Sequence, residues 1–98
     1  MKLLDLFRAV KEENLSKEQV EDYYSQMCRV RADVKIELAG LTKEKGMFML
    51  HNQESSVSQR KVNWYGSEKG QREIELKSYV SACGDHLDSL KTRIYALL

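Results

Sequence analysis

The chain has 98 residues, of which 16 are Lys or Arg, 15 are Asp or Glu and none is proline. This length allows one domain at most, and a formal net charge of +1 excludes the strong overall field that draws very basic proteins onto nucleic acids or acidic membranes. Charged residues make up 32% of the chain, and the bias toward good helix formers predicts an all-α protein.

The first 13 residues predict a short amphipathic helix, because Leu3, Leu6, Phe7 and Val10 share one side of a helical wheel. This start is charged too early for a signal peptide, and no run approaches the roughly 18 apolar residues of a membrane span. We therefore expect a cytoplasmic protein without a membrane partner, in the host-cell cytoplasm if the chain is phage-encoded.

A long helix is expected over residues 16–50. Ser16 and Gln19 have the spacing of a capping box, in which each side chain bonds the other residue's backbone N–H. Apolar residues then recur every seven positions along one face, as expected for a helix that packs lengthwise on another. These residues are Val20, Met27, Val34, Leu41 and Phe48.

Residues 51–58 lose this period and gain residues that favour turns, which predicts a reversal of the chain. A second long helix is expected over residues 59–98. Glycines at 66 and 70 allow a break between them, and the sequence leaves open whether helix resumes before Arg60 or only after Gly66. The predicted architecture is an antiparallel helical hairpin preceded by a short N-terminal helix.

The second helix carries a heptad seam, with apolar residues at alternating spacings of four and three. A regular stripe on so small a chain predicts burial against partner chains, and hence a coiled-coil-like homo-oligomer that uses the seam as its interface. Cys83 lies in this row, and neither it nor Cys28 has a CxxC spacing, so both are expected to be free thiols. The seam consists of Leu76, Val80, Cys83, Leu87, Leu90, Ile94 and Leu97.

The titratable residues do not predict an enzyme. His51 and His86 lie far apart in the chain, neither has a partner at metal-ligand spacing, and the carboxylates alternate with Lys and Arg as on solvated helix faces. We therefore expect no catalytic site, no metal and no cofactor.

Residues 59–72 are the most informative segment for function, because they combine four cations with one acid and contain the only tryptophan. Cations neutralise phosphates and flat rings stack on bases, so this mixture is typical of single-stranded nucleic-acid binding. A structural interpretation competes with it, in which the rings cover the end of the seam and the cations keep that end soluble. The candidate DNA-binding residues are Arg60, Lys61, Trp64, Tyr65, Lys69 and Arg72.

Two segments resemble the UvsY-type recombination mediator proteins of large tailed phages. Residues 61–66, Lys-Val-Asn-Trp-Tyr-Gly, are similar to that family's motif of a basic residue, two spacers, an aromatic pair and a nearby glycine. Residues 83–97 are similar to a family helix with Leu-Asp, Lys-Ser/Thr-Arg and aromatic-Ala pairs. The chain departs from the family in its shorter length and in a glycine that follows the aromatic pair directly.

The resemblance implies a non-enzymatic accessory protein of phage DNA recombination or replication. Such a protein forms homo-oligomers, binds single-stranded DNA, and helps load a recombinase onto DNA coated by single-stranded-DNA-binding protein. Lys61, Trp64 and Tyr65 match the motif and would take the DNA-contact role, while Arg60, Lys69 and Arg72 are added here from charge alone.

Two other functions remain open. Trp64 to Gly66 also form a Trp-x-Gly tripeptide, which resembles the WXG-type secreted helical hairpins of bacterial export systems, although here it follows the expected reversal rather than lying in it. The chain is also compatible with a helical adaptor that binds another protein and makes no contact with nucleic acid.

Overall fold

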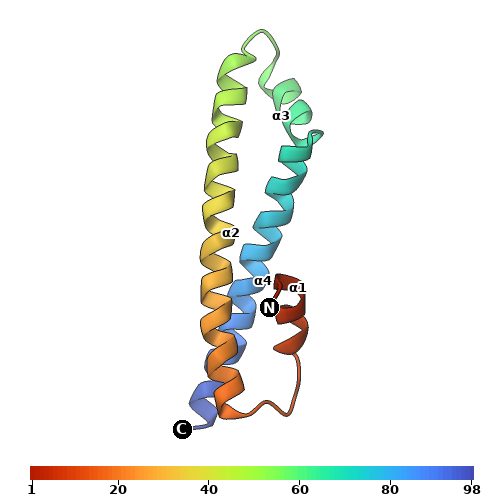
Figure 1. The fold of residues 1–98 in the computed structure, drawn as a ribbon. Coiled ribbons are helices and arrows are strands. Elements are labelled where there is room, and N and C mark those ends of the chain that lie inside the picture. The colour runs from red at the N-terminus through yellow and green to blue at the C-terminus, as the bar shows by residue number, and fades with distance from the viewer.

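The computed structural model describes residues 1–98 and confirms the expected all-α hairpin. It contains four helices, α1 (Leu3–Ala9), α2 (Lys17–His51), α3 (Val57–Tyr65) and α4 (Glu68–Ala96), and no strand. The two long helices α2 and α4 run antiparallel, and the molecule measures 59 × 20 × 17 Å (Figure 1). We refer to residues 37–77 as the tip half of the hairpin, and to residues 1–36 and 78–98 together as the base half.

The start of α2 follows the sequence pattern. The Ser16 Oγ accepts a hydrogen bond from the Gln19 backbone N–H at 3.1 Å, and the Gln19 Oε1 accepts one from the Ser16 N–H at 2.8 Å. Both halves of the capping box are therefore formed, which satisfies two donors that a helix start leaves without partners. The helix continues to His51, and residues 52–56 form the reversal.

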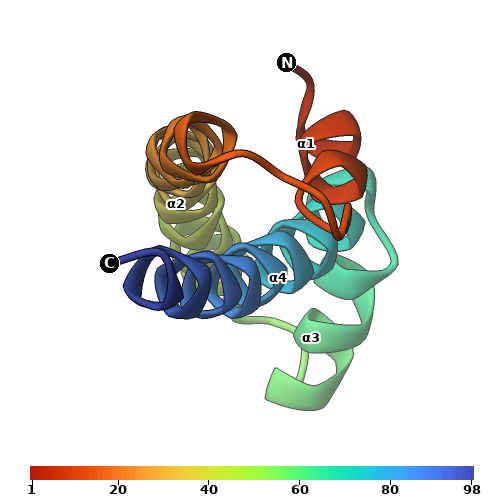
Figure 2. The same cartoon turned by 90° about the horizontal axis from the view of Figure 1, so that it is seen from below.

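The N-terminal helix is shorter than the sequence predicted. It ends at Ala9, and the chain then crosses to α2 as a turn and a short extended stretch (Figure 2). Leu6 and Val10 from this region are 0% and 5% exposed and join Val20 and Met27 of α2 and two residues of α4 in the main core cluster. The base half is therefore a three-helix arrangement with an apolar centre, whereas α1 does not reach the tip half (Figure 1).

The heptad seam lies inside this hairpin, which corrects its assignment as an oligomer interface. Leu76, Cys83 and Leu90 are each 1% exposed or less, and the last two belong to the core cluster with α1 and α2. The regular stripe is thus covered within the chain and needs no partner, because α2 and α1 supply the apolar surface. Homo-oligomerisation stays a prediction that this seam no longer supports. The other seam residues are the half-buried Val80, Leu87 and Ile94, and Leu97, which is 47% exposed.

The second arm breaks between α3 and α4, at Gly66 and Ser67. The Ser67 Oγ caps α4 by accepting from the Gly70 N–H at 3.1 Å, and the Ser67 hydroxyl and backbone N–H both donate to the Trp64 carbonyl. A Cβ built on Gly70 would lie 1.9 Å from that carbonyl oxygen. Gly70 is therefore required by the close approach of α4 to the end of α3, and helix resumes before Arg60, at Val57.

Candidate nucleic-acid interface

The six candidate DNA-binding residues lie in the tip half, on α3 and on the first turns of α4, but they have different surroundings. Lys61 is exposed and forms no ion pair, and Arg60 donates through Nη1 to the Met49 carbonyl at 2.5 Å without a carboxylate partner. The Arg60 bond satisfies an acceptor in the last turn of α2, where a cation also interacts favourably with the helix dipole. These two residues keep their positive charge unpaired by any acid.

Trp64 is buried, which corrects its expected role as an exposed stacking platform. The side chain is 3% exposed, and its ring lies 5.6 Å from the Phe48 ring with an interplanar angle of 47°. The indole Nε1 is buried without a hydrogen-bond partner. Its ring faces therefore pack mainly against the hairpin, as the structural interpretation of this residue predicted.

Tyr65 is half-buried and belongs to a polar cluster between the arms. Its hydroxyl accepts a hydrogen bond from the Lys45 ammonium, which also lies 4.5 Å from the Tyr65 ring centroid and 3.4 Å from the Glu73 Oε1. The Tyr65 hydrogen bond, together with the Glu73 charge, raises the pKa of Lys45. Tyr65 thus fixes the position of α3 on the two long helices rather than standing free in solvent.

Lys69 and Arg72 are exposed but paired with acids. The Lys69 Nζ lies 3.0 Å from the Glu44 Oε2, and the Arg72 guanidinium binds both Glu37 oxygens, at 2.6 and 3.1 Å, and Glu75 at 2.5 Å. The Arg72 hydrogen bonds lower the pKa of Glu37 and raise the pKa of Arg72 itself. Such exposed pairs contribute about 0–1 kcal/mol each, so an incoming phosphate can compete for these cations.

Lys45 and Glu73 form a polar pair between the arms that the candidate list did not include. Glu73 is 1% exposed and lies near two ammonium groups, those of Lys45 at 3.4 Å and Lys77 at 3.7 Å. A signal for both was present, because Glu73 continues the seam spacing backward from Leu76, and Lys45 lies four residues after Leu41 and three before Phe48 on the packing face of α2. Opposite charges at facing seam positions predict a buried pair.

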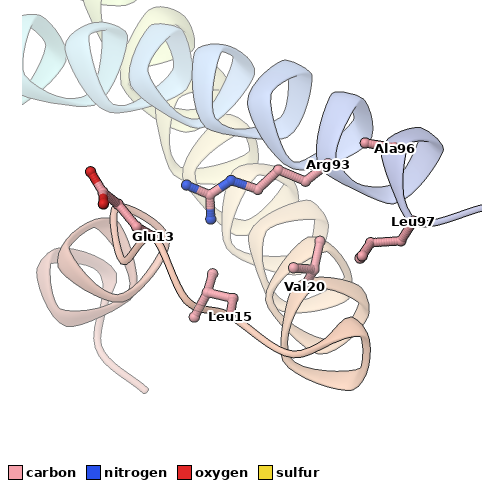
Figure 3. Close-up of a pocket in the computed structure, with 6 residues that line it drawn as sticks. All are labelled: Glu13, Leu15, Val20, Arg93, Ala96 and Leu97. Carbon is pink, nitrogen blue, oxygen red and sulfur yellow. The ribbon is translucent and has the colours of Figure 1, made fainter.

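The surface has four hollows, three in the base half and one in the tip half. One base hollow, of about 200 Å³, lies where the chain enters α2 and α4 ends (Figure 3). There Arg93 reaches across from α4 and donates through Nη1 to the Glu12 carbonyl at 3.0 Å. The tip hollow is larger, at about 410 Å³, and lies between α2 and the α3–α4 break. Its walls are Glu44, Phe48, Trp64, Ser67, Glu68 and Lys69.

The histidines do not converge on this region. His86 stacks on Phe7 in the base half, with ring centroids 4.8 Å apart, and burial together with the Lys11 charge lowers the pKa of His86. His51 is exposed at the end of α2, and no group of three His, Cys, Asp or Glu side chains is arranged to hold a metal ion.

Comparisons of the chain with protein-family models, curated proteins and solved structures found no match. No helix in the structure has the length and apolar character needed to cross a bilayer.

Proposed function

We propose that this protein is a non-enzymatic accessory of phage DNA recombination or replication, which binds single-stranded DNA at the tip half and helps load a recombinase. The observation that carries the proposal is the pair of cations on α3, Arg60 and Lys61, which no carboxylate neutralises. Lys69 and Arg72 extend the cationic surface, because a phosphate can displace or share their exposed acid partners.

The resemblance supports the recombination part of the proposal. The segment 61–66 forms the end of α3 and the break, and segment 83–97 lies in the second half of α4. The mechanism is passive: each tip binds weakly, and several copies hold an extended strand by avidity and present it to the recombinase and the single-strand coat protein. The contact set is revised to Arg60, Lys61, Lys69 and Arg72, with Trp64 and Tyr65 as supports behind them.

A salt-dependent DNA titration tests this proposal. Fluorescence anisotropy of a labelled oligonucleotide is measured at two salt concentrations with the unchanged protein, with Lys61→Ala, and with Lys17→Ala as a charge-matched control at the far end of α2. We expect Lys61→Ala to weaken binding and to reduce the slope of log K against log salt by about 0.7, the value for one phosphate contact on a single strand. The Lys17→Ala variant should bind as the unchanged protein does. Absence of binding at the lower salt concentration would refute the function.

A protein-binding adaptor is the second candidate, and exposed apolar residues on the outer face of α2 favour it. Ile36, Met47 and Leu50 are 71%, 48% and 56% exposed and recur at helical spacing on the side away from α4. If the adaptor function is correct, the Met47→Glu substitution abolishes binding of the protein partner, and the oligonucleotide titration of the unchanged protein shows no binding. The WXG-type alternative has less support, since Trp64–Gly66 lies at the α3–α4 break and residues 52–56 make the reversal.

A further inference from the structure

The tip hollow combines flat rings with hydrogen-bonding groups. It is lined by Phe48 and Trp64 and by the polar residues Glu44, Ser67, Glu68 and Lys69. Trp64 is 3% exposed and its Nε1 is buried, so a molecule in the hollow reaches only an edge of the indole. Phe48 is only half-buried, which leaves part of its ring for contact.

The charges around the hollow limit what it can accept. Carboxylates only accept hydrogen bonds, so the ligand must present donors on its edge, and the ammonium of Lys69 favours an anionic group nearby. Glu44 and Lys69 are already paired at 3.0 Å, and both side chains are about half exposed, 49% and 62%. Lys69 therefore keeps donors free for a second acceptor. Lys61 lies one helical turn before Trp64 and adds a further cation without an acid partner.

We propose that this hollow binds one nucleobase of single-stranded DNA, with the exposed part of the Phe48 ring against the base, Trp64 packed behind Phe48, and Glu44 or Glu68 accepting hydrogen bonds from the base edge. The proposal rests on the function proposed above and adds a base preference to it. The volume of about 410 Å³ lies in the usual range of small-molecule sites, and the exposed part of the Phe48 ring suits contact with a planar ring system. Lys69 and Lys61 bind the neighbouring phosphates.

The carboxylates favour guanine and disfavour thymine. Guanine carries two adjacent donors on its pairing edge, N1–H and N2–H₂, which match the two oxygens of one carboxylate. Thymine has a single donor between two carbonyl acceptors, which the carboxylate oxygens repel. A good bidentate contact discriminates between bases strongly enough to give a preference of about fivefold or more.

The experiment compares an oligothymidylate with the same oligonucleotide carrying two central guanines. Binding is followed by anisotropy, and contact with the hollow is followed by the intrinsic fluorescence of Trp64, the only tryptophan in the chain. We expect the guanine oligonucleotide to bind about fivefold more tightly or better, and to quench Trp64 more strongly.

Four substitutions identify the source of the preference. Glu44→Gln and Glu68→Gln, made separately and together, should bring the two affinities closer to each other, while Glu54→Gln, which removes a carboxylate outside the hollow, should leave their ratio unchanged. Phe48→Leu should weaken binding of both oligonucleotides, with circular dichroism verifying that helix content is retained.

The outcomes separate this inference from the proposed function. Equal affinities in the unchanged protein, or DNA binding without any change in Trp64 fluorescence, would overturn the nucleobase site while the DNA-binding function stands. Failure of both oligonucleotides to bind at low salt would overturn the function and the nucleobase site together.

Discussion

The base half and the tip half of the hairpin are held together by different forces. All six residues of the core cluster are in the base half, where α1 covers the groove between the two long helices. In the tip half the arms are joined by the Phe48–Trp64 ring pair, the buried Glu73 with its lysines, and exposed ion pairs. Apolar burial is worth about 25 cal/mol per Å² and is not screened by ions, whereas exposed ion pairs contribute little and are screened.

The two halves of the chain therefore differ in the interactions that stabilise them. The base half supplies most of the stability, so the tip half is free to carry polar groups that stabilise little. Groups that make few strong contacts within the fold are the ones a ligand can recruit, which is why the proposed binding surface is assigned to the tip half. If stability and recognition are separated in this way, substitutions in the two halves should have different consequences.

The largest effect is expected from a cavity in the base half. Leu90→Ala removes a side chain that is 1% exposed within the core cluster, and such truncations cost about 2–5 kcal/mol of unfolding free energy. Urea unfolding followed by circular dichroism measures the loss. A loss below about 1 kcal/mol would show that the seam is not the centre of the fold.

A smaller and more local effect is expected at the α3–α4 break. Gly70→Ala places a methyl group against the Trp64 carbonyl, and such overpacking lowers the free energy of unfolding by about 1–3 kcal/mol. The emission of Trp64 should shift in this variant, because α3 must move. Gly40→Ala is the matched control, since nothing lies within 4 Å of the added methyl, and it should stabilise α2 by up to about 1 kcal/mol. Equal stability changes in the two variants would contradict the close approach at Gly70.

The smallest effect is a pH dependence of the base half. Burial of His86 against Phe7, with Lys11 nearby, lowers the pKa of the imidazole in the folded state below its ordinary 6.5, while Asp85 acts in the opposite direction. The unfolded chain therefore binds this proton more readily. The contribution of the neutral His86 imidazole to stability is complete above pH 6.5 and is lost as the pH falls through the folded-state pKa of His86.

Urea midpoints at pH 7.5 and 5.5 test that dependence. The unchanged protein should be less stable at the lower pH, and His86→Gln should remove most of the difference. If the variant keeps the full difference, the titrating group lies elsewhere in the molecule.

The sequence predicted the elements better than it predicted their partners. The Ser16–Gln19 capping box, the reversal near residues 51–58 and the break near Gly66 all depend on local chemistry, and each occurs close to its expected position. The heptad seam was misassigned, because periodicity identifies a buried face without saying whether the covering helix belongs to the same chain. α2 and α1 cover it here.

The candidate site was less predictable for the same physical reason. Residue type alone is equally compatible with Trp64 as a base-stacking ring and as a core ring. Only its packing against Phe48 shows that it is a core ring. Lys69 and Arg72 pair with acids of α2 that lie 25 and 35 residues earlier in the chain, Glu44 and Glu37, and Arg72 also pairs with Glu75 three residues later. All three acids lie outside residues 59–72, so counting charges along that segment could not reveal these pairs. Lys61 is the candidate whose expected exposure and free charge the structure retains.

Amide hydrogen exchange with and without single-stranded oligonucleotide at low salt tests most directly whether the tip half is the binding surface. We expect slower exchange in α3, in the first turns of α4 and in the last turns of α2, with the amides of α1 and the base half unchanged. Slowing confined to the base half, or no slowing at a saturating oligonucleotide concentration, would show that the tip half does not bind DNA.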